Sequence, residues 1–352
     1  MFLELYDIIN LGGKMKIAVD KNTYQVADNK NEYIYLFDDE PLDQLLKTNL
    51  HCIHFSKCNF TDINLTDYEI ECIKKTKPSN RGWDKLPSKI NYKIGIIIPN
   101  YNYEHTIEKC LKSILNQTYK NYEIIFIDDM STDGSVQLAK SMLKSPHKVI
   151  ELKQKRLNGG ARNEGYLYLS DDVDYVYYVD SDDWLNGNNV LEMINNKLQT
   201  KPDVLFVGMA RFKNDELSTC FIPDYKDKYE AFIGWSGSCG KVIKKSLATR
   251  QECLYNEGTL KEDRNQHCKV CFYMNTFELL KEPIYVWNQE NSKSVTTIRE
   301  KVIWGTSTIR HYADTLQFAL SIKGQDPKID RIMNERVMKT KQEMEMGGDK
   351  QW

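Results

Sequence analysis

Several features that would assign the chain to common protein classes are absent from its 352 residues. No apolar run is long enough to cross a bilayer, and the first residues lack the basic segment and small-residue cleavage site of a secretory signal. We therefore expect a cytoplasmic protein without a transmembrane segment. A large charge excess is also missing, because 48 lysines and arginines oppose 50 aspartates and glutamates. The resulting net charge of −2 provides no overall attraction to nucleic acid or to an anionic membrane.

Cysteine is too sparse for a small disulfide-stabilised scaffold, since the chain has nine in total, an odd number. We expect reduced thiols. Two clusters combine cysteine with histidine: His51, Cys52, His54, Cys58 and Cys72 form one, and His267, Cys268 and Cys271 form the other. Neither cluster repeats the paired CxxC spacing of a structural zinc site. Small buried side chains are the favoured interpretation, with metal binding left open.

The phosphate-binding loops of two large nucleotide-binding classes are missing as well. The apolar run at residues 94–98 continues into Pro99-Asn100-Tyr101-Asn102, which is neither a GxGxxG turn nor a Walker A loop. Hydride transfer with a dinucleotide and ATP hydrolysis are therefore disfavoured. A nucleotidyltransferase is disfavoured too, because that chemistry normally needs a glycine-rich, basic loop at this point.

The pattern of apolar residues divides the chain into three regions. Up to residue 90, short apolar stretches at 16–19, 33–37 and 52–55 are broken by polar clusters, which predicts a small, strand-rich N-terminal accessory module. A polar, proline-containing stretch at 77–88 leads to a boundary near Asn91. Residues 91–298 form the main domain, and residues 299–352 a C-terminal helical extension.

In the main domain, apolar runs of strand length alternate with amphipathic segments. The runs lie at 94–98, 122–127, 148–152, 175–179 and 204–207. The alternation predicts an α/β fold, Rossmann-like, with a mostly parallel sheet flanked by helices. Beyond Asn256 we predict helix at 262–280 and again at 300–346. The last helix carries an apolar stripe suited to packing or to forming a homodimer.

Parallel strands deliver their carboxyl ends to one edge of a sheet, where ligands bind. The first run ends in Pro99-Asn100-Tyr101-Asn102, the second in Asp128-Asp129, and the fourth in Asp180-Ser181-Asp182-Asp183. Five aspartates converging there would repel one another unless a cation compensated them. Hard divalent cations such as Mg²⁺ and Mn²⁺ prefer such oxygen ligands. An alternative for the carboxylate group is a solvated turn.

A glycine turn, Asn158-Gly159-Gly160, opens the next helix and is followed by Arg162. Free amides at a helix start and a guanidinium can face phosphate. An ordinary left-handed turn is the alternative.

Together these segments resemble the successive motifs of family-two glycosyltransferases with the GT-A fold. The similar segments are 96–102, 113–119, 123–129, 131–133, 158–163 and 179–185, in matching order and spacing, and the resemblance extends over about 93–294. It implies an inverting enzyme that moves a sugar from a nucleotide-diphosphate sugar, with a UDP-sugar favoured, to an acceptor hydroxyl, with Mn²⁺ or Mg²⁺ as cofactor.

The resemblance also implies roles for individual residues. Tyr101, next to Pro99, would stack on the nucleotide base, Asp129 would bind base or ribose with Asp128 supporting it, and Arg162 would reach the nucleotide. Asp180 and Asp182 would be the DxD pair that contacts ribose and metal, with Ser181 between them and Asp183 beside them.

An inverting displacement needs a base opposite the leaving group. By resemblance Asp263 of the pair Glu262-Asp263 is that base, although both acids could merely suit a helix N-terminus. Trp235 would line the sugar pocket or fill core. Two stretches depart from the family pattern: His267 could contact metal or acceptor or lie on a helix surface, and residues 212–235 match nothing in the family.

The competing interpretation is a nucleotide-sugar-binding module without catalytic activity. The presence of both the DxD pair and the acid pair Glu262-Asp263 disfavours it. The sequence leaves the sugar open. It also leaves open whether the acceptor is a glycan, a lipid-linked glycan, a protein or a modified nucleic acid.

Overall fold

The structure is a computed structural model that describes residues 16–18, 33–37, 51–54, 90–291 and 301–345, with backbone alone for the first three ranges and for 301–306. Two compact units divide the chain, residues 1–90 and 91–352. The first unit holds strands β1 (Lys16–Ala18), β2 (Tyr33–Phe37) and β3 (His51–His54), which pair in parallel in that order. The side chains of the first cysteine and histidine cluster lie outside the described residues.

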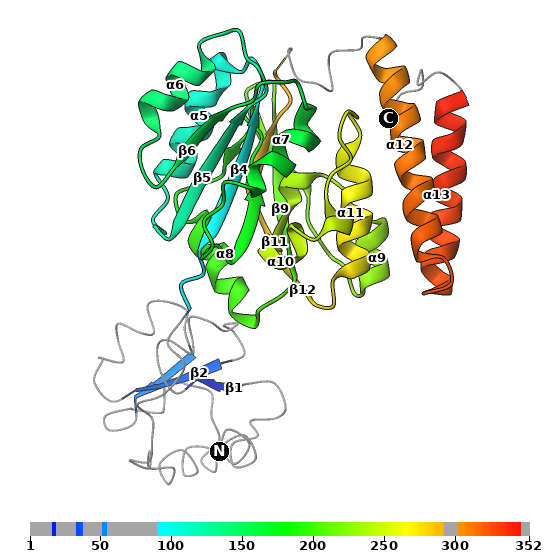
Figure 1. The fold of residues 1–352 in the computed structure, drawn as a ribbon. Helices are drawn as coiled ribbons and strands as arrows, with labels where there is room; N and C mark the ends of the chain where they lie inside the picture. The colour runs from blue at the N-terminus through cyan, green and yellow to red at the C-terminus, as the bar shows by residue number, and fades with distance from the viewer. Residues whose placement is uncertain (1–15, 19–32, 38–50, 55–89, 292–300, 346–352) are drawn as a thin grey trace. The chain divides into compact units, whose positions relative to one another are not determined.

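One half of the sheet in the second unit is parallel. Its strands β4 (Ile94–Asn100), β5 (Tyr122–Asp128), β6 (Lys148–Glu151) and β7 (Tyr175–Tyr178) lie in the order β6-β5-β4-β7. Every residue of β4, β5 and β7 is buried, because helices cover both faces (Figure 1). These are the strands that the apolar runs predict.

The other half of the sheet is mixed. Strand β11 (Lys241–Lys244) runs antiparallel between β7 and β9 (Val204–Lys213), and β12 (Phe277–Asn288) is parallel to β9. The two remaining strands are short or exposed: β8 (Trp184–Leu185) pairs with β12, and β10 (Glu216–Phe221) pairs with β9, both antiparallel. Because β11 is antiparallel to both of its neighbours, β9 runs parallel to β7.

Helices pack the two faces into separate hydrophobic clusters. On one face lie α5 (Glu104–Leu115), α6 (Ser135–Met142) and α8 (Val190–Lys197), and α5 buries the predicted stripe Ile107, Cys110, Leu111 and Ile114. On the other face lie α7 (Leu157–Tyr166) and α11 (Glu262–Tyr273). Short turns of helix complete this part: η4 (Leu198–Thr200), α9 (Lys228–Ile233), η5 (Ser238–Gly240), α10 (Lys245–Ala248) and η6 (Gln251–Cys253).

Two helix predictions are wrong in extent. The helix predicted at 262–280 ends at Tyr273, and residues from Phe277 onward form β12, because pairing with β9 outweighs local helical propensity. The helix predicted at 300–346 is a hairpin of α12 (Lys301–Ile322) and α13 (Pro327–Glu345). Gly324 makes the turn between them at φ 84°, a conformation that favours glycine.

The α12–α13 hairpin lies beside α11 (Figure 1). None of the helices in the described ranges is long and apolar enough to cross a membrane.

Gly208 of β9 is expected to be intolerant of a side chain. A Cβ there would lie 2.5 Å from the carbonyl oxygen of Glu282 and 2.7 Å from that of Lys281, where the register of β9 and β12 shifts. Gly208→Ala should lower the free energy of unfolding by about 1–3 kcal/mol, because backbone must move to accommodate the methyl group. Urea unfolding checks this, with Thr219→Ala on exposed β10 as the control, and an equal effect of both variants would contradict it.

Candidate active site

A cavity of about 220 Å³ opens where the ends of β4 and β7 meet the start of α11. Seven of the site residues predicted from the sequence line it: Pro99, Arg162, Asp180, Ser181, Asp182, Glu262 and Asp263. Trp235 and Asp183 line it as well. The structure thus brings the aspartate cluster that follows β7 and the acid pair of α11 to one cavity, although they are about eighty residues apart in the chain.

The carboxylates that follow β7 are held by residues of β12 and the segment after it. Tyr285 donates its hydroxyl to Asp183 Oδ2 at 2.6 Å, and the backbone N–H of Asn288 donates to Asp183 Oδ1 at 2.8 Å. Asn291 Nδ2 donates to Asp182 Oδ2 at 2.9 Å. Burial, reinforced by the charge of Asp180, raises the pKa of Asp182 to about 6, and burial raises the pKa of Asp183 well above its usual range. Negative charge in this loop is therefore destabilised.

The chemistry of this loop fits a hard divalent cation. Ligand atoms of Asp180, Asp183 and Cys239 all lie within 4.8 Å of one another. Burial raises the pKa of the Cys239 thiol well above its ordinary value, so sulfur stays protonated and is a poor ligand for Mg²⁺ or Mn²⁺. The carboxylate oxygens are the suitable donors, and a cation would compensate charges that burial disfavours.

Arg162 of α7 joins the two halves of the site. Its side chain is 3 % exposed. Nη2 donates to Asp180 Oδ1 at 2.7 Å, and Nη1 donates to Glu262 Oε1 at 2.8 Å. The guanidinium therefore ties the aspartate loop to the first turn of α11, in addition to lining the cavity.

Glu262 and Asp263 begin α11 and differ in surroundings. Glu262 is buried, and burial raises its pKa to about 7 although the attraction of Arg162 opposes that shift. Asp263 is half-buried, and burial raises its pKa against the opposing charges of Arg162 and Lys241. Asp263 is thus an accessible carboxylate whose affinity for a proton exceeds that of an ordinary aspartate. A raised pKa suits a group that accepts a proton during a reaction.

The remaining predicted residues do not line this cavity. Asp128 accepts hydrogen bonds from Asn100 Nδ2 at 2.8 Å and from the N–H of Ser131 at 2.8 Å, so it organises the loop after β5. Asp129 accepts from the N–H groups of Arg156 at 2.7 Å and Leu157 at 2.9 Å. Tyr101 is 43 % exposed, with the ammonium of Lys155 over its ring.

Gly159 in the predicted glycine turn has a packing role. A Cβ there would lie 2.9 Å from the carbonyl oxygen of Asn256 and 3.0 Å from Cγ of Glu262. Glycine therefore allows α7 to approach the start of α11 closely. This close approach brings Arg162 within hydrogen-bond distance of Glu262. The predicted turn, residues 158–160, lies in the first turn of α7, and the residue before it, Leu157, adopts φ 60°.

His267 does not lie on a helix surface, as one of the sequence interpretations had it. Nor does its position support a contact with a metal or with the acceptor. The side chain is fully buried, and Nε2 donates to the carbonyl of Ala231 at 2.8 Å. Lys241, also fully buried, donates from Nζ to the carbonyls of Ser236 at 2.9 Å and Gly237 at 2.8 Å and lies 3.4 Å from His267 Nδ1. Lys241 thus holds the cavity wall at residues 236–237, and His267 contacts α9 through Ala231.

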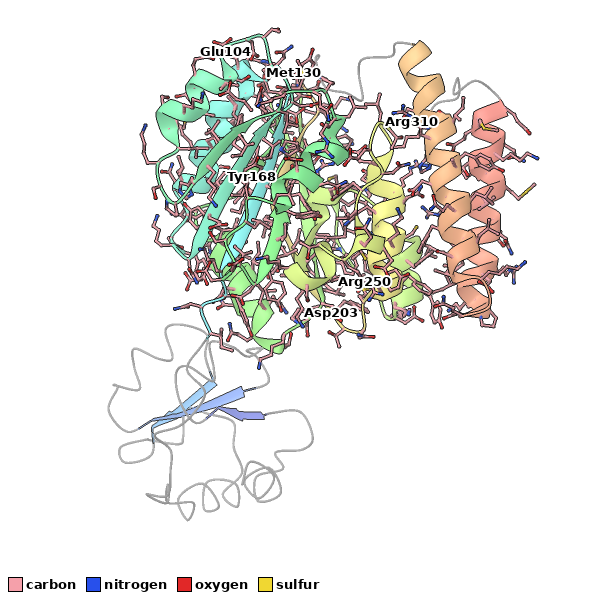
Figure 2. The ribbon with its side chains drawn as sticks, in the orientation of Figure 1. Glu104, Met130, Tyr168, Asp203, Arg250 and Arg310 are labelled. Atoms are coloured by element: carbon pink, nitrogen blue, oxygen red, sulfur yellow. The ribbon has the colours of Figure 1, made fainter. Side chains whose placement is uncertain are left out.

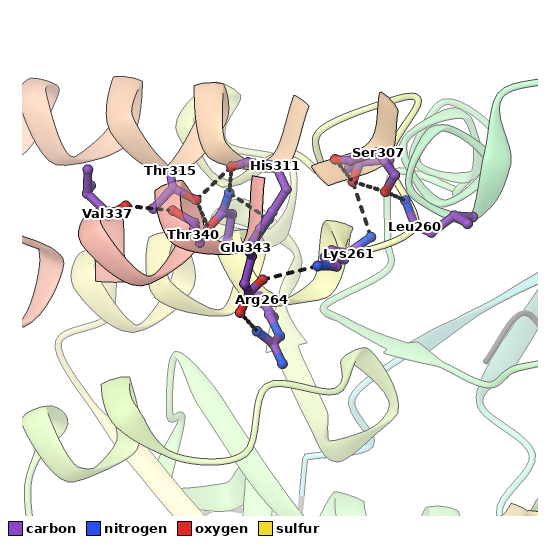
Figure 3. Close-up of polar contacts among 11 residues, drawn as sticks. Leu260, Lys261, Arg264, Ser307, His311, Thr315, Val337, Thr340 and Glu343 are labelled. Carbon is purple, nitrogen blue, oxygen red and sulfur yellow. Dashed lines mark hydrogen bonds and ion pairs between the residues drawn. The ribbon is translucent and has the colours of Figure 1, made fainter. Parts of the chain in front are cut away.

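The sequence did not predict two parts of the chain that hold the site residues in place. His105 on α5 donates from Nε2 to Asn291 Oδ1 at 3.2 Å, and Asn291 in turn holds Asp182. The α12–α13 hairpin supports α11: Lys261 Nζ donates to Glu343 Oε2 at 3.1 Å, and the N–H of Leu260 donates to Ser307 Oγ at 2.7 Å (Figure 3). Arg310, labelled in Figure 2, donates to the carbonyl of Gly258 at 2.9 Å. No sequence signal marks these long-range pairs.

The fold of the second unit is the GT-A fold. Residues 1–349 of TarS from S. aureus, solved in complex with UDP-GlcNAc, superimpose with a TM-score of 0.55, at 20% identity, over 66% of this chain and 67% of that one. The family described as Glycosyl transferase family 2 matches residues 95–243. Residues 95–243 are thus similar to a family 2 glycosyltransferase domain.

Curated relatives are glycosyltransferases as well. Glycosyltransferase GlyA of Streptococcus pneumoniae is 34% identical over 36% of this chain and 18% of its own length. The poly(ribitol-phosphate) beta-N-acetylglucosaminyltransferase TarP of Staphylococcus aureus is 32% identical over 52% of this chain and 58% of its own length. The chain thus covers less than two thirds of each of these relatives.

Replacing Arg162 alone should destabilise the protein more than replacing Arg162 and Glu262 together by uncharged residues. Arg162→Met leaves the Glu262 carboxylate buried without its partner, which we expect to lower the free energy of unfolding by about 3–5 kcal/mol. The double variant Arg162→Met/Glu262→Gln leaves only the more exposed Asp180 carboxylate without the guanidinium, so part of the loss should be recovered.

Urea unfolding of the three proteins measures both effects. Arg331→Met is the matched control, because Arg331 and Glu335 form an exposed ion pair with side chains 83% and 69% accessible. That variant should change stability by less than about 1 kcal/mol. A double variant as unstable as Arg162→Met would show that the bridge is not the source of the effect.

Proposed function

We propose that the chain is an inverting glycosyltransferase that moves a sugar from a UDP-sugar to an acceptor hydroxyl. The observation that carries the proposal is the single cavity lined by the DxD carboxylates Asp180 and Asp182 and by the half-buried Asp263. A donor-binding group and a candidate base in one cavity are the two elements that a displacement at an anomeric carbon requires. The family match of residues 95–243 agrees with this reaction class.

Asp180 and Asp182, the predicted DxD pair, would hold a divalent cation, together with Asp183, whose ligand atom lies within 4.8 Å of that of Asp180, and Mn²⁺ or Mg²⁺ suits these oxygen ligands. Such an ion supplies positive charge where the leaving diphosphate becomes more negative. Asn291 and, through it, His105 orient Asp182, while Arg162 orients Asp180. Pro99, whose carbonyl accepts a hydrogen bond from the Ser181 hydroxyl, fixes the same loop to the end of β4.

Asp263 would accept the proton of the acceptor hydroxyl. Its raised pKa makes it a stronger base than an exposed aspartate, and Lys241 and Arg162 keep its ionised form available. Glu262 lies beside it but is bonded to Arg162 and buried, so its role is to position the first turn of α11. Attack from the side opposite the diphosphate gives inversion.

The nucleotide would lie toward the loops after β4 and β5, where Tyr101 offers an exposed ring and Asp128 and Asp129 shape the rim. Support for UDP comes from TarS, which shares this fold and whose structures were solved with UDP-GlcNAc and with UDP. Residues 91–298 would form the catalytic domain, residues 1–90 an accessory module and residues 299–352 a helical extension. An inactive nucleotide-sugar-binding module is less favoured, because Asp263 lines the same cavity as the donor carboxylates.

Asp182→Ala should abolish metal-dependent turnover of the donor. In a release assay with a panel of nucleotide-sugars, the wild-type protein should liberate nucleotide diphosphate from one donor with Mn²⁺ or Mg²⁺ and not with chelator. The variant should be slower by about 10²-fold or more, because one carboxylate ligand of the cation is lost. Turnover that is unaffected by chelator would contradict the assignment of the metal.

Asp263→Asn should separate binding from transfer. The amide keeps the shape of the carboxylate but accepts no proton, so transfer should fall by about 10²–10⁴-fold while donor affinity stays near that of the wild type. Calorimetric titration of UDP and a transfer assay measure the two quantities. Asp171→Asn, an exposed aspartate outside the cavity, is the control. Full transfer activity in Asp263→Asn would assign the base elsewhere.

A further inference from the structure

One hydroxyl in the wall of the candidate site has no part in the reaction proposed above. Ser238, in η5, lines the same cavity of about 220 Å³ as the aspartate cluster and the acid pair, and it is 3% exposed. The hydroxyl of Tyr255 donates to Ser238 Oγ at 2.9 Å. A serine hydroxyl can accept hydrogen bonds and also carries one proton of its own. Because Oγ accepts from Tyr255, that proton is left for another acceptor.

Tyr255 is a rigid donor to Ser238. It is buried, and burial raises its pKa well above the ordinary value, so the phenol keeps its proton. Its ring packs edge to face against Tyr178, with the two centroids 5.7 Å apart, and Cζ of Arg162 lies 5.3 Å from the ring centroid. The phenol therefore has little freedom to turn away from Ser238.

The backbone of Tyr255 is held in place by Asn163 of α7. Asn163 Nδ2 donates to the carbonyl of Tyr255 at 2.9 Å, and its Oδ1 accepts from the N–H of Tyr255 at 3.0 Å. Asn163 ends the segment 158–163, which resembles a family motif, yet neither the metal ligands nor the candidate base contact it through a hydrogen bond in the described residues. Its two bonds instead fix the position of the Ser238 hydroxyl through Tyr255.

The proton of the Ser238 hydroxyl has no acceptor within the side chains and backbone described at 90–291 and 307–345. A buried donor without an acceptor is unfavourable, and most such groups in proteins are paired. Since Ser238 lies in the cavity wall, an oxygen atom of a bound molecule is in reach of this donor. The hydroxyl is thus suited to contact a substrate oxygen that accepts a hydrogen bond.

Ser238 lies next to the aspartate loop along one edge of the sheet. The strands follow the order β5-β4-β7-β11, and β11 is antiparallel to β7, so residues just before β11 lie beside residues just after β7. The position of Cys239 shows this, because its Sγ is within 4.8 Å of ligand atoms of Asp180 and Asp183. Along this edge the loops after β5 and β4 come first, the aspartates next, and Ser238 last.

We propose that Ser238 donates a hydrogen bond to an oxygen of the sugar moiety of the donor, with Tyr255 and Asn163 as positioning residues. The inference rests on the proposed function, which places the nucleotide at the loops after β4 and β5 and the diphosphate at the aspartates. In a nucleotide-diphosphate sugar the sugar follows the diphosphate, and along the sheet edge Ser238 follows the aspartates. A site that donates to a sugar oxygen disfavours a sugar that lacks this oxygen.

Calorimetric titration with UDP and with a panel of UDP-sugars, in the presence of Mn²⁺, tests the inference. The panel is UDP-glucose, UDP-galactose and UDP-N-acetylglucosamine. The quantity compared is the Kd of each UDP-sugar divided by the Kd of UDP, which removes changes in the nucleotide and diphosphate contacts. For the sugar that the wild type binds best, Ser238→Ala should raise this ratio by about 3- to 10-fold, because one hydrogen bond is lost. The Kd of UDP should stay unchanged.

Ser236→Ala is the matched control. This serine belongs to the same segment but lines a second cavity, of about 340 Å³, and not the first. The substitution keeps the Ser236 carbonyl, which accepts from Lys241. The ratio of the two dissociation constants should therefore equal that of the wild type.

Tyr255→Phe tests the positioning role. Without the phenol hydroxyl the Ser238 side chain is free to rotate, so the ratio should rise by about 2- to 5-fold. The double variant Ser238→Ala/Tyr255→Phe should bind no more weakly than Ser238→Ala, because both changes act through one hydrogen bond. Effects that simply multiply would show that Tyr255 acts by another route, and would overturn its positioning role.

Two results would overturn the contact with the sugar. One is an unchanged ratio in Ser238→Ala. The other is equal weakening of UDP and of the UDP-sugar, which would place the hydroxyl at the nucleotide or the diphosphate. Both leave the proposed function standing, because the wild-type protein still binds the donor. A wild-type protein that binds neither UDP nor any UDP-sugar of the panel would contradict the proposed function, and the inference with it.

Discussion

The candidate site depends on one buried interaction, the guanidinium of Arg162 between Asp180 and Glu262. These three residues come from the helix after β6, the loop after β7 and the first turn of α11. Without the cation, burial would oppose ionisation of Glu262, whose pKa is raised to about 7 even with Arg162 in contact. Because breaking such a pair leaves a charge without compensation, the two halves of the site are held at a fixed separation. In the proposed reaction, the donor-binding loop and the base would therefore be coupled through this one side chain.

The parallel half of the sheet could be predicted from the sequence because its signal is local. The fully buried β4, β5 and β7 appear as continuous apolar runs, and Asp128 and Asp180 follow two of them at the chain reversals. The signal fails for β12, which carries the charged residues Glu278, Lys281 and Glu282 and continues a helical pattern. Pairing with β9 decides its structure, and no property of residues 277–288 taken alone reports that partner.

The partners of the site residues could not be predicted for the same reason. The sequence indicates that Arg162 follows a glycine turn, which suggests contact with phosphate, yet the contact with Glu262 spans 100 residues of chain. Gly159 is explained only by the approach of Asn256 and Glu262 in space. Likewise, His267 lies on a helix that is buried nearly all round, so its single-residue departure from the family pattern gives no information on burial. Motifs locate a site, and long-range contacts determine what each residue does in it.

The cavity wall at residues 234–237 imposes a final constraint. Trp235 and Gly237 line the cavity of the candidate site, whereas Gly234 and Ser236 line a second cavity of about 340 Å³, so a shift of this segment would change both cavities together. Lys241 holds that segment by donating to two of its carbonyls, and burial lowers the pKa of this ammonium to about 8. A buried lysine without hydrogen bonds would be strongly destabilising, whereas here the carbonyls of Ser236 and Gly237 compensate it. The two hydrogen bonds that compensate this buried cation therefore hold the cavity wall at residues 236–237 in place.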